Sequence, residues 1–218
     1  PNGNGHNGDG GWLTGHYDVD HTKLYRFSVW VKRTTDQAGG QFYLGLYANS
    51  GSPVLRSDNG NSEVNPYFDC RLISAFTKDV WHLVVGHVYP SGTSVPQARH
   101  ANTGVFTVAG GKVDDTDGCS LGGDAIMQST TTSLRHRSYH YYADENTASS
   151  ISWAYPRMEE VTAETPSSLQ CLQLSQTASR AGYFLSDDNY DRVDMGGDTT
   201  LIIWYYNQPL SSRGTIFQ

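Results

Sequence analysis

The chain has 218 residues, enough to bury one sizeable core and to leave room for part of a second module. Its 15 Lys and Arg against 22 Asp and Glu give a formal net charge of −7. Binding to nucleic acid needs clustered cations, so we expect no nucleic-acid partner. Charged residues make up only 17% of the chain, a composition typical of secreted and virion β proteins. We therefore expect a virion-surface or extracellular location, and, without a long apolar run, no membrane insertion.

The N-terminal segment, residues 1–10 (PNGNGHNGDG), has the composition of a linker, and we expect it to belong to a longer chain. The three cysteines, Cys70, Cys119 and Cys171, lie far apart. Their spacing predicts neither a metal knuckle nor a disulfide framework, and at most one bridge could form within the chain. Buried or free thiols are the simpler expectation.

Strand patterns then follow one another along the chain. Tyr25 to Lys32 (YRFSVWVK) alternates apolar and polar residues with the period of two of a half-buried strand. Five further β-rich runs are separated by Gly, Ser, Asn and Asp, and cover residues 41–47, 81–89, 104–108, 135–142 and 150–161. Short strands with turn-rich joints predict an all-β sandwich. The stretch 91–132 is expected to form long loops with one short strand.

The composition changes again after the last of these runs. Residues 164–180 are predicted to be a linker, and residues 181–218 start a new β pattern with the apolar run Leu201 to Tyr206. About 40 residues seldom bury a sufficient core alone, so we expect this tail to be part of a second sandwich.

The order of the strand-like segments resembles a known kind of module. The segments are YRFSVWVKR, QFYLGLY, VNPYFD, KDVWHLVVGHVYPSG and LRHRSYHYYADENTASSISWAYPRMEEV. In this order they resemble a jelly-roll module of marine phage tail fibres and bacterial surface proteins, and are more distantly similar to carbohydrate-binding modules. The resemblance implies a jelly-roll β-sandwich over residues 11–163 and a glycan-binding, lectin-like function.

The tail resembles the opening of a laminin-G or concanavalin A-like sandwich. Its markers are Tyr183 with Phe184, the turn from Tyr190 to Val193, the strand Leu201 to Tyr206 and the final SSRGTIF. This resemblance implies that residues 181–218 are the N-terminal part of such a domain.

The segment Arg135 to Tyr142 (RHRSYHYY) has the most unusual local composition of the chain. On a strand, Arg135, Arg137, Tyr139 and Tyr141 share one face, and His136, Ser138, His140 and Tyr142 share the other. Aromatic rings stack on the C–H faces of sugars, and Arg or His donates hydrogen bonds to hydroxyls and carboxylates. The alternative is that the tyrosines pack between the sheets and the arginines pair with acids.

From these segments and the other large aromatics we predict a glycan-binding site in which tyrosine and tryptophan rings stack on sugars while arginine and histidine fix their orientation. Its predicted residues are Trp81, Arg135, Arg137, Tyr139, His140, Tyr141, Trp153 and Tyr155.

Metal and catalytic signals are weak. His82 and His87 lie in WHLVVGHV without HxH or HExxH spacing, which argues against zinc. We predict no cofactor and leave open a structural calcium ion in one of the acidic loops, DDTDG (114–118), DEN (144–146) or DDNYD (187–191). No Gly-x-Ser-x-Gly elbow is present, and Glu159 and Glu160 point to opposite faces of a strand, so they cannot form a glycosidase pair.

The sequence therefore predicts a non-catalytic glycan-binding and adhesion module rather than an enzyme. Its expected partners are a cell-surface or extracellular polysaccharide and other copies or subunits of a larger assembly. The competing prediction is a structural assembly or spacer domain of a virion or extracellular filament. An enzyme would need a cleft with converging His, Tyr and acidic groups and at least one strongly shifted pKa.

Overall fold

Two β-sheets make up the part of the chain that the computed structural model describes, which is residues 10–49, 51, 53–114, 123–141, 149–162 and 200–201. The first sheet has five strands. They are β1 (Gly10–Leu13), β12 (Ser133–Tyr141), β4 (Gln41–Ala48) and β7 (Tyr67–Leu72) in spatial order, with β2 (Tyr17–Asp18) also paired to β12.

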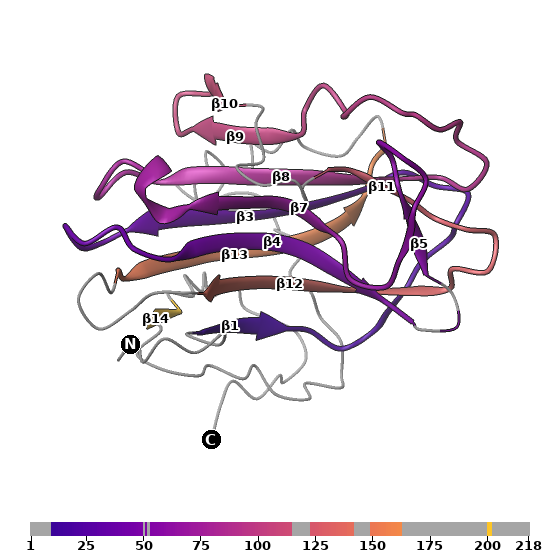
Figure 1. Ribbon diagram of the computed structural model, residues 1–218, viewed down its shortest axis with the longest axis horizontal. Helices are drawn as coiled ribbons and strands as arrows, with labels where there is room; N and C mark the ends of the chain where they lie inside the picture. Colours follow the sequence, from indigo (N-terminus) through magenta and orange to yellow (C-terminus); the bar gives the residue numbers. More distant parts are fainter. Residues whose placement is uncertain are drawn as a thin grey trace, which may run out of the picture.

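The second sheet has nine strands. Its main order is β14 (Thr200–Leu201), β13 (Ile151–Glu160), β3 (Tyr25–Arg33), β8 (His82–Tyr89), β11 (Ala125–Ile126), β5 (Val54–Arg56) and β6 (Ser62–Glu63). The hairpin of β9 (Gly104–Thr107) and β10 (Lys112–Asp114) extends from β8. One short 3-10 helix, η1 (Ile73–Ala75), follows β7. The long strands of both sheets run along the long axis of the molecule (Figure 1).

The core lies between the two sheets because each long strand turns its apolar residues inward. On β3 these are the alternating residues Tyr25, Phe27, Val29 and Val31, as the sequence predicts. Phe27 meets Phe68 of the opposite sheet with ring centroids 5.2 Å apart. The all-β sandwich expected from the sequence is confirmed.

Trp153 and His140 face this core, which corrects their assignment to the glycan site. The Trp153 indole is 1% exposed, lies edge-on to Trp12 and donates from Nε1 to Ser138 Oγ at 3.1 Å. His140 is 2% exposed, and its Nε2 lies 2.9 Å from Ser149 Oγ. Both side chains belong to inward-facing positions, so neither reaches a ligand at the surface.

Cys70 of β7 is buried and disulfide-bonded, which corrects the expectation of free thiols. Cys119 and Cys171 lie outside the described residues, as do all the calcium-candidate acids except Asp114 of β10. From the predicted second module only Thr200–Leu201 is described. It pairs in parallel with Ser152 and Trp153 at the edge of the nine-stranded sheet.

Within the described residues, no helix has the length and apolar composition that a membrane span requires.

Candidate functional site

The outer face of the five-stranded sheet carries the four remaining predicted residues of β12. The strand alternates as expected, with Leu134, His136, Ser138 and His140 turned inward. Arg135, Arg137, Tyr139 and Tyr141 therefore lie together on the outer face. Two tyrosines of β4 lie on the same face, because the strand register pairs Tyr43 with Tyr139 and Tyr47 with Arg135.

Seven side chains from three strands make up this array, which we call the Tyr–Arg face. Its members are Tyr43, Tyr47, Tyr67, Arg135, Arg137, Tyr139 and Tyr141. All except Tyr43 and Arg137 keep part of their surface exposed.

The tyrosines and arginines of the face contact one another. The Tyr139 and Tyr141 rings stack with centroids 4.8 Å apart and planes 12° from parallel. Tyr43 packs on Tyr67 at 4.8 Å and on Tyr141 at 5.5 Å. Because each ring is held by its neighbours, the face has little rotamer freedom left to lose on binding a ligand.

Arg135 and Arg137 lie among these rings. The Arg135 guanidinium carbon is 5.8 Å from the Tyr47 centroid, and its Nε donates to the Thr14 carbonyl. The Arg137 guanidinium carbon is 4.1 Å from the Tyr67 centroid and 5.6 Å from that of Tyr139. Burial lowers the pKa of Arg137 from its usual value, because desolvation disfavours the charged form, although it remains a cation at neutral pH.

Two glycines on the flanking strands leave room for these side chains. A Cβ at Gly11, opposite Tyr139, would lie 2.6 Å from Tyr139 Cδ1. A Cβ at Gly45, opposite Arg137, would lie 2.8 Å from Tyr67 Cδ1 and 3.3 Å from Arg137 Nε. The Arg137–Tyr67 contact therefore depends on the absence of a side chain at Gly45.

We expect Gly45→Ala to lower the free energy of unfolding by about 1–3 kcal/mol, because the added methyl group overpacks a site whose nearest atom, the Pro66 carbonyl oxygen at 2.6 Å, is backbone. Urea denaturation measures this change. Gly111→Ala is the matched control, since its Cβ would meet nothing closer than Thr107 Oγ1 at 3.7 Å. Equal stability of the two variants would contradict the packing described here.

Trp81 and Tyr155, the other two predicted site residues, lie on the opposite side of the sandwich. They pack against a second apolar cluster on the outer face of the nine-stranded sheet, formed by Trp30, Leu83, Val85 and Ala154, together with Phe106. Tyr155 has φ +51° in the bulge of β13, a conformation rare for an aromatic residue. The eight predicted residues are therefore divided among the two outer faces and the core, and do not form one site.

A buried polar cluster lies where β8, β11 and the 98–103 loop meet. Asp124, 1% exposed, accepts from the backbone N–H groups of His87 at 2.9 Å and His100 at 2.7 Å, and from Thr103 Oγ1 at 2.8 Å. His87 Nδ1 lies 2.8 Å from the same hydroxyl. With Asp124 ionised, the Thr103 hydroxyl donates to the carboxylate, and in that state His87 Nδ1 carries a proton and donates it to Thr103.

This arrangement differs from a catalytic nucleophile and base. A base must accept the proton of the hydroxyl, whereas His87 donates to it. Burial lowers the pKa of His87 to about 2, with the neighbouring His100 and Arg26 acting in the same direction. Burial raises the pKa of Asp124 against the effect of its three donors. The cluster joins three segments of backbone through the Asp124 carboxylate and the Thr103 hydroxyl.

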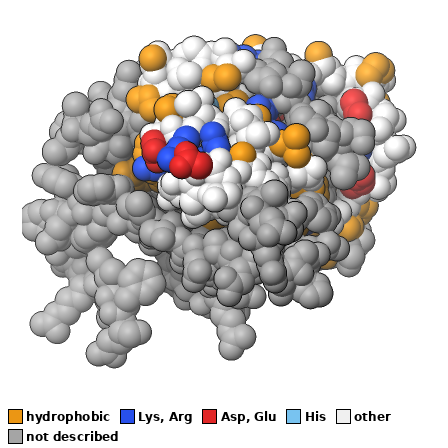
Figure 2. Space-filling view, turned by 60° about the vertical axis from the view of Figure 1, so that its left-hand side comes forward, with side chains coloured by type: hydrophobic (Ala, Val, Ile, Leu, Met, Phe, Trp, Pro, Cys, Tyr) orange, Lys and Arg blue, Asp and Glu red, His pale blue; other side chains and the backbone are white. Residues whose placement is uncertain are grey.

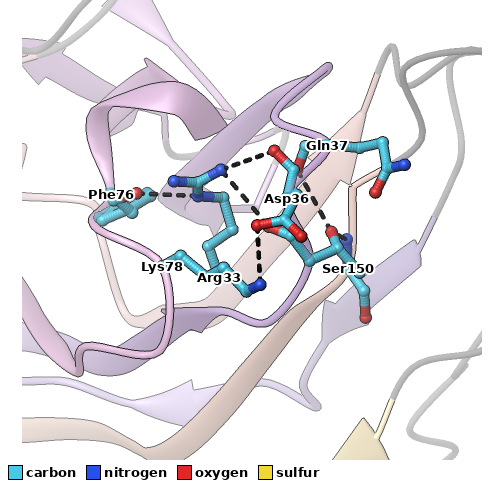
Figure 3. Close-up of polar contacts among 7 residues, drawn as sticks. Arg33, Asp36, Gln37, Phe76, Lys78 and Ser150 are labelled. Atoms are coloured by element: carbon cyan, nitrogen blue, oxygen red, sulfur yellow. Dashed lines mark hydrogen bonds and ion pairs between the residues drawn. The ribbon is translucent and has the colours of Figure 1, made fainter.

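On the face shown in Figure 2, a few Lys or Arg and Asp or Glu side chains lie next to one another in a small group. Figure 3 shows one such group, in which Arg33 Nε donates to the Phe76 carbonyl at 2.9 Å and Lys78 Nζ meets Asp36 Oδ1 at 2.7 Å. Arg33 Nη1 also donates to the Asp36 carbonyl at 3.1 Å. Because the donors of Arg33 are directed at backbone carbonyls, this group holds the 34–37 loop against the segment after η1.

Metal ligands do not converge in the described part of the chain, where no group of three or more His, Cys, Asp or Glu could hold an ion. Four residues of this face are not among those predicted from the sequence: Tyr43, Tyr47, Tyr67 and Gly45. The alternation of QFYLGLY would have placed Tyr43, Gly45 and Tyr47 on one face of β4, opposite Phe42, Leu44 and Leu46. Only the pairing of β4 with β12 brings them to the arginines.

No family model, curated protein or solved structure matches this chain.

Proposed function

We propose that this chain is a non-catalytic glycan-binding and adhesion module, and that the Tyr–Arg face is its binding site. The observation that carries the proposal is the interleaving of five tyrosines and two arginines on one outer face of a rigid sheet. Tyrosine presents a flat apolar ring and a polar hydroxyl, which suits a ligand whose two sides are C–H rich and whose edge is hydroxylated. Arginine adds donors in a fixed geometry.

The setting proposed for this module is a virion appendage or an extracellular surface protein of the jelly-roll kind. A shallow face made of a few rings binds a single sugar segment weakly. Several copies on one particle raise the effective concentration of sites, so adhesion does not require a tight individual site. The low share of charged residues agrees with this setting.

The test is a glycan-array screen of the whole 218-residue chain, followed by titration of the best ligand. We expect Tyr139→Ala combined with Tyr141→Ala to weaken binding by about tenfold or more, because it removes stacking surface worth about 0.5–1.5 kcal/mol per aromatic pair beyond burial. Trp81→Ala, on the other side of the sandwich, is the control and should bind like the unmodified chain. Equal loss in both variants, or silence across the array, would contradict the proposal.

Structural assembly is the second candidate function, and the apolar cluster around Trp30 favours it. Trp81, Phe106 and Tyr155 are only partly buried there, and the buried Nε1 of Trp30 has no acceptor. Sedimentation velocity tests this function, because association of copies that is lost in Trp81→Ala would place the contact on this cluster.

A further inference from the structure

Arg137 differs from the other buried arginines of the described residues. Four arginines are less than a tenth exposed. Arg26 pairs with Glu159, Arg56 with Asp58, and Arg71 with Asp69. Arg137, 5% exposed, has no carboxylate partner among the residues that the structure describes.

The immediate surroundings of Arg137 satisfy only part of its guanidinium. Nη2 donates to the carbonyl of Asn65, and the guanidinium also forms a hydrogen bond with the Tyr139 side chain, whereas Nε is buried without an acceptor. The Tyr67 and Tyr139 rings lie beside it and offer the negative faces of their π systems. A ring face is a weaker counter-charge than an oxyanion, and it accepts no strong in-plane hydrogen bond.

The charges on the rest of the Tyr–Arg face have the same sign. Arg135 lies two residues away on β12 and is held by the Thr14 carbonyl rather than by an acid. Among the described strand residues, register places one acidic side chain on this side of the sheet, Asp18, which lies opposite Ser133 at the far end of β12. The face thus combines two cations with aromatic rings in a chain whose net charge is −7.

A buried cation without a counter-ion costs folding free energy that the other three buried arginines avoid. A ligand oxyanion bound on the face would supply the missing counter-charge to the Arg137 cation, whose Nε stays buried, while the partly exposed Arg135 beside it would donate hydrogen bonds to that oxyanion. The tyrosines beside it would contact the sugar ring that carries the anion. A free inorganic anion would make only the contact with the arginines, because it has no sugar ring to pack on the tyrosines.

From this we infer that the Tyr–Arg face selects an anionic polysaccharide, one whose sugars carry a carboxylate or a sulfate, and that Arg137 is its charge-specificity residue. The inference rests on the proposed glycan-binding function and adds the chemical class of the ligand. The overall negative charge of the protein opposes such binding, so a preference for anionic sugars must come from a local site.

The deciding experiment compares charged and neutral polymers of the same backbone, using the unmodified 218-residue chain. The pairs are polygalacturonate with its fully methyl-esterified form, and dextran sulfate with dextran. We expect at least one charged polymer to bind about tenfold to 100-fold more tightly than its neutral counterpart, because hydrogen bonds to charged groups contribute about 1.5–3 kcal/mol. The pair that shows the preference identifies carboxylate or sulfate.

The variant arm assigns the preference to one residue. Arg137→Gln should remove most of the discrimination, Arg137→Lys should keep part of it, and Lys78→Gln, which removes one surface charge elsewhere, should keep all of it. An equal decrease in Arg137→Gln and Lys78→Gln would overturn the inference, because it would indicate non-specific attraction. If Arg137→Gln does not fold, Arg137→Lys decides the role of Arg137, because a discrimination equal to that of the unmodified chain would overturn the assignment to this residue.

The two levels of the proposal fail in different ways. If neutral and charged polymers bind equally and binding still depends on Tyr139 and Tyr141, glycan binding stands and anion selection is wrong. If no polymer binds and the glycan array is silent, both proposals are wrong.

Discussion

Lowering the pH from 7 to 5 should reduce the free energy of unfolding by about 4 kcal/mol, because two histidines that are buried and neutral in the folded chain take up protons when it unfolds. The pKa of His87 is lowered to about 2, first by burial and then by His100 and Arg26. The pKa of His136 is lowered by burial to about 4, against a hydrogen bond to the Ser28 carbonyl that acts to raise it.

The direction follows from the two states. An unfolded histidine binds a proton near its usual pKa of about 6.5. Between that value and about 4, the unfolded chain holds two more protons at these positions than the folded chain does. The stabilising contribution is therefore fully present above about pH 7 and is lost as the pH falls, at about 2 kcal/mol per histidine between pH 7 and 5.

Asp124 acts in the opposite direction. Burial raises its pKa, so the folded chain takes up that proton before the unfolded chain does. Acid then stabilises the folded state at this one position, and offsets part of the histidine effect once the pH approaches the range in which Asp124 titrates. As the pH falls, we therefore expect the steepest loss of stability at pH values above the range in which Asp124 titrates.

Urea denaturation at pH 7, 6 and 5 measures the effect. His136→Gln is the informative variant, since Gln can still accept from Trp12 Nε1 and donate to the Ser28 carbonyl but does not titrate. Its stability at pH 7 should be lower, because the ring stacked between Trp12 and Phe27 is lost. Its pH slope should be about half that of the unmodified chain. A stability independent of pH would contradict the burial of these histidines.

Gly86→Val should be the most destabilising single substitution among the described glycines, with a loss of about 3 kcal/mol or more. Gly86 lies in the middle of β8, opposite Phe27 of β3, and the Phe68 ring packs directly on it. A Cβ there would lie 2.0 Å from Phe68 Cγ and 2.3 Å from Phe68 Cβ. Val adds two further methyl groups at the same place.

A double-mutant cycle identifies the cause. Phe68→Leu removes part of the ring and leaves a small cavity, which costs stability by itself. Combined with Gly86→Ala, the same change provides space for the new methyl group, so the double variant should be more stable than the sum of the single changes predicts, by about 1 kcal/mol. Additive losses would show that the contact between Gly86 and Phe68 is not the origin of the effect.

Much of the strand pattern was predictable because it depends on local alternation. The run Tyr25 to Lys32 was predicted as a strand and is β3, Tyr25–Arg33. The run 135–142 was predicted with its two faces, and β12 shows the same division from Arg135 to Tyr141. Short strands such as β5 and β11 were missed, because two or three residues carry no periodic signal and are held by pairing with distant segments.

The site was predictable only in part, for a related reason. Period two shows that Arg137 and Tyr139 share a face, but it does not show whether that face is the inner or the outer one. Trp153 illustrates the difficulty, since a large aromatic suits both a core and a sugar platform. Two partners of Arg137 lie about 70 positions earlier in the sequence: Tyr67 in β7 and Asn65 in the loop before it. Only the pairing of strands in the sheet brings them to Arg137.

The division of β12 into inward even-numbered and outward odd-numbered positions has a consequence for how this protein can evolve. Changes at positions 135, 137, 139 and 141 alter the outer face and leave the core residues Leu134, His136 and Ser138 in place. The chemistry of the outer face can then change through point substitutions without loss of the fold. Insertion or deletion of one residue within β12 would instead exchange the two sets, placing arginines in the core and Leu134 on the surface. Related proteins that diversify this strand should therefore differ in its amino-acid residues and keep its length.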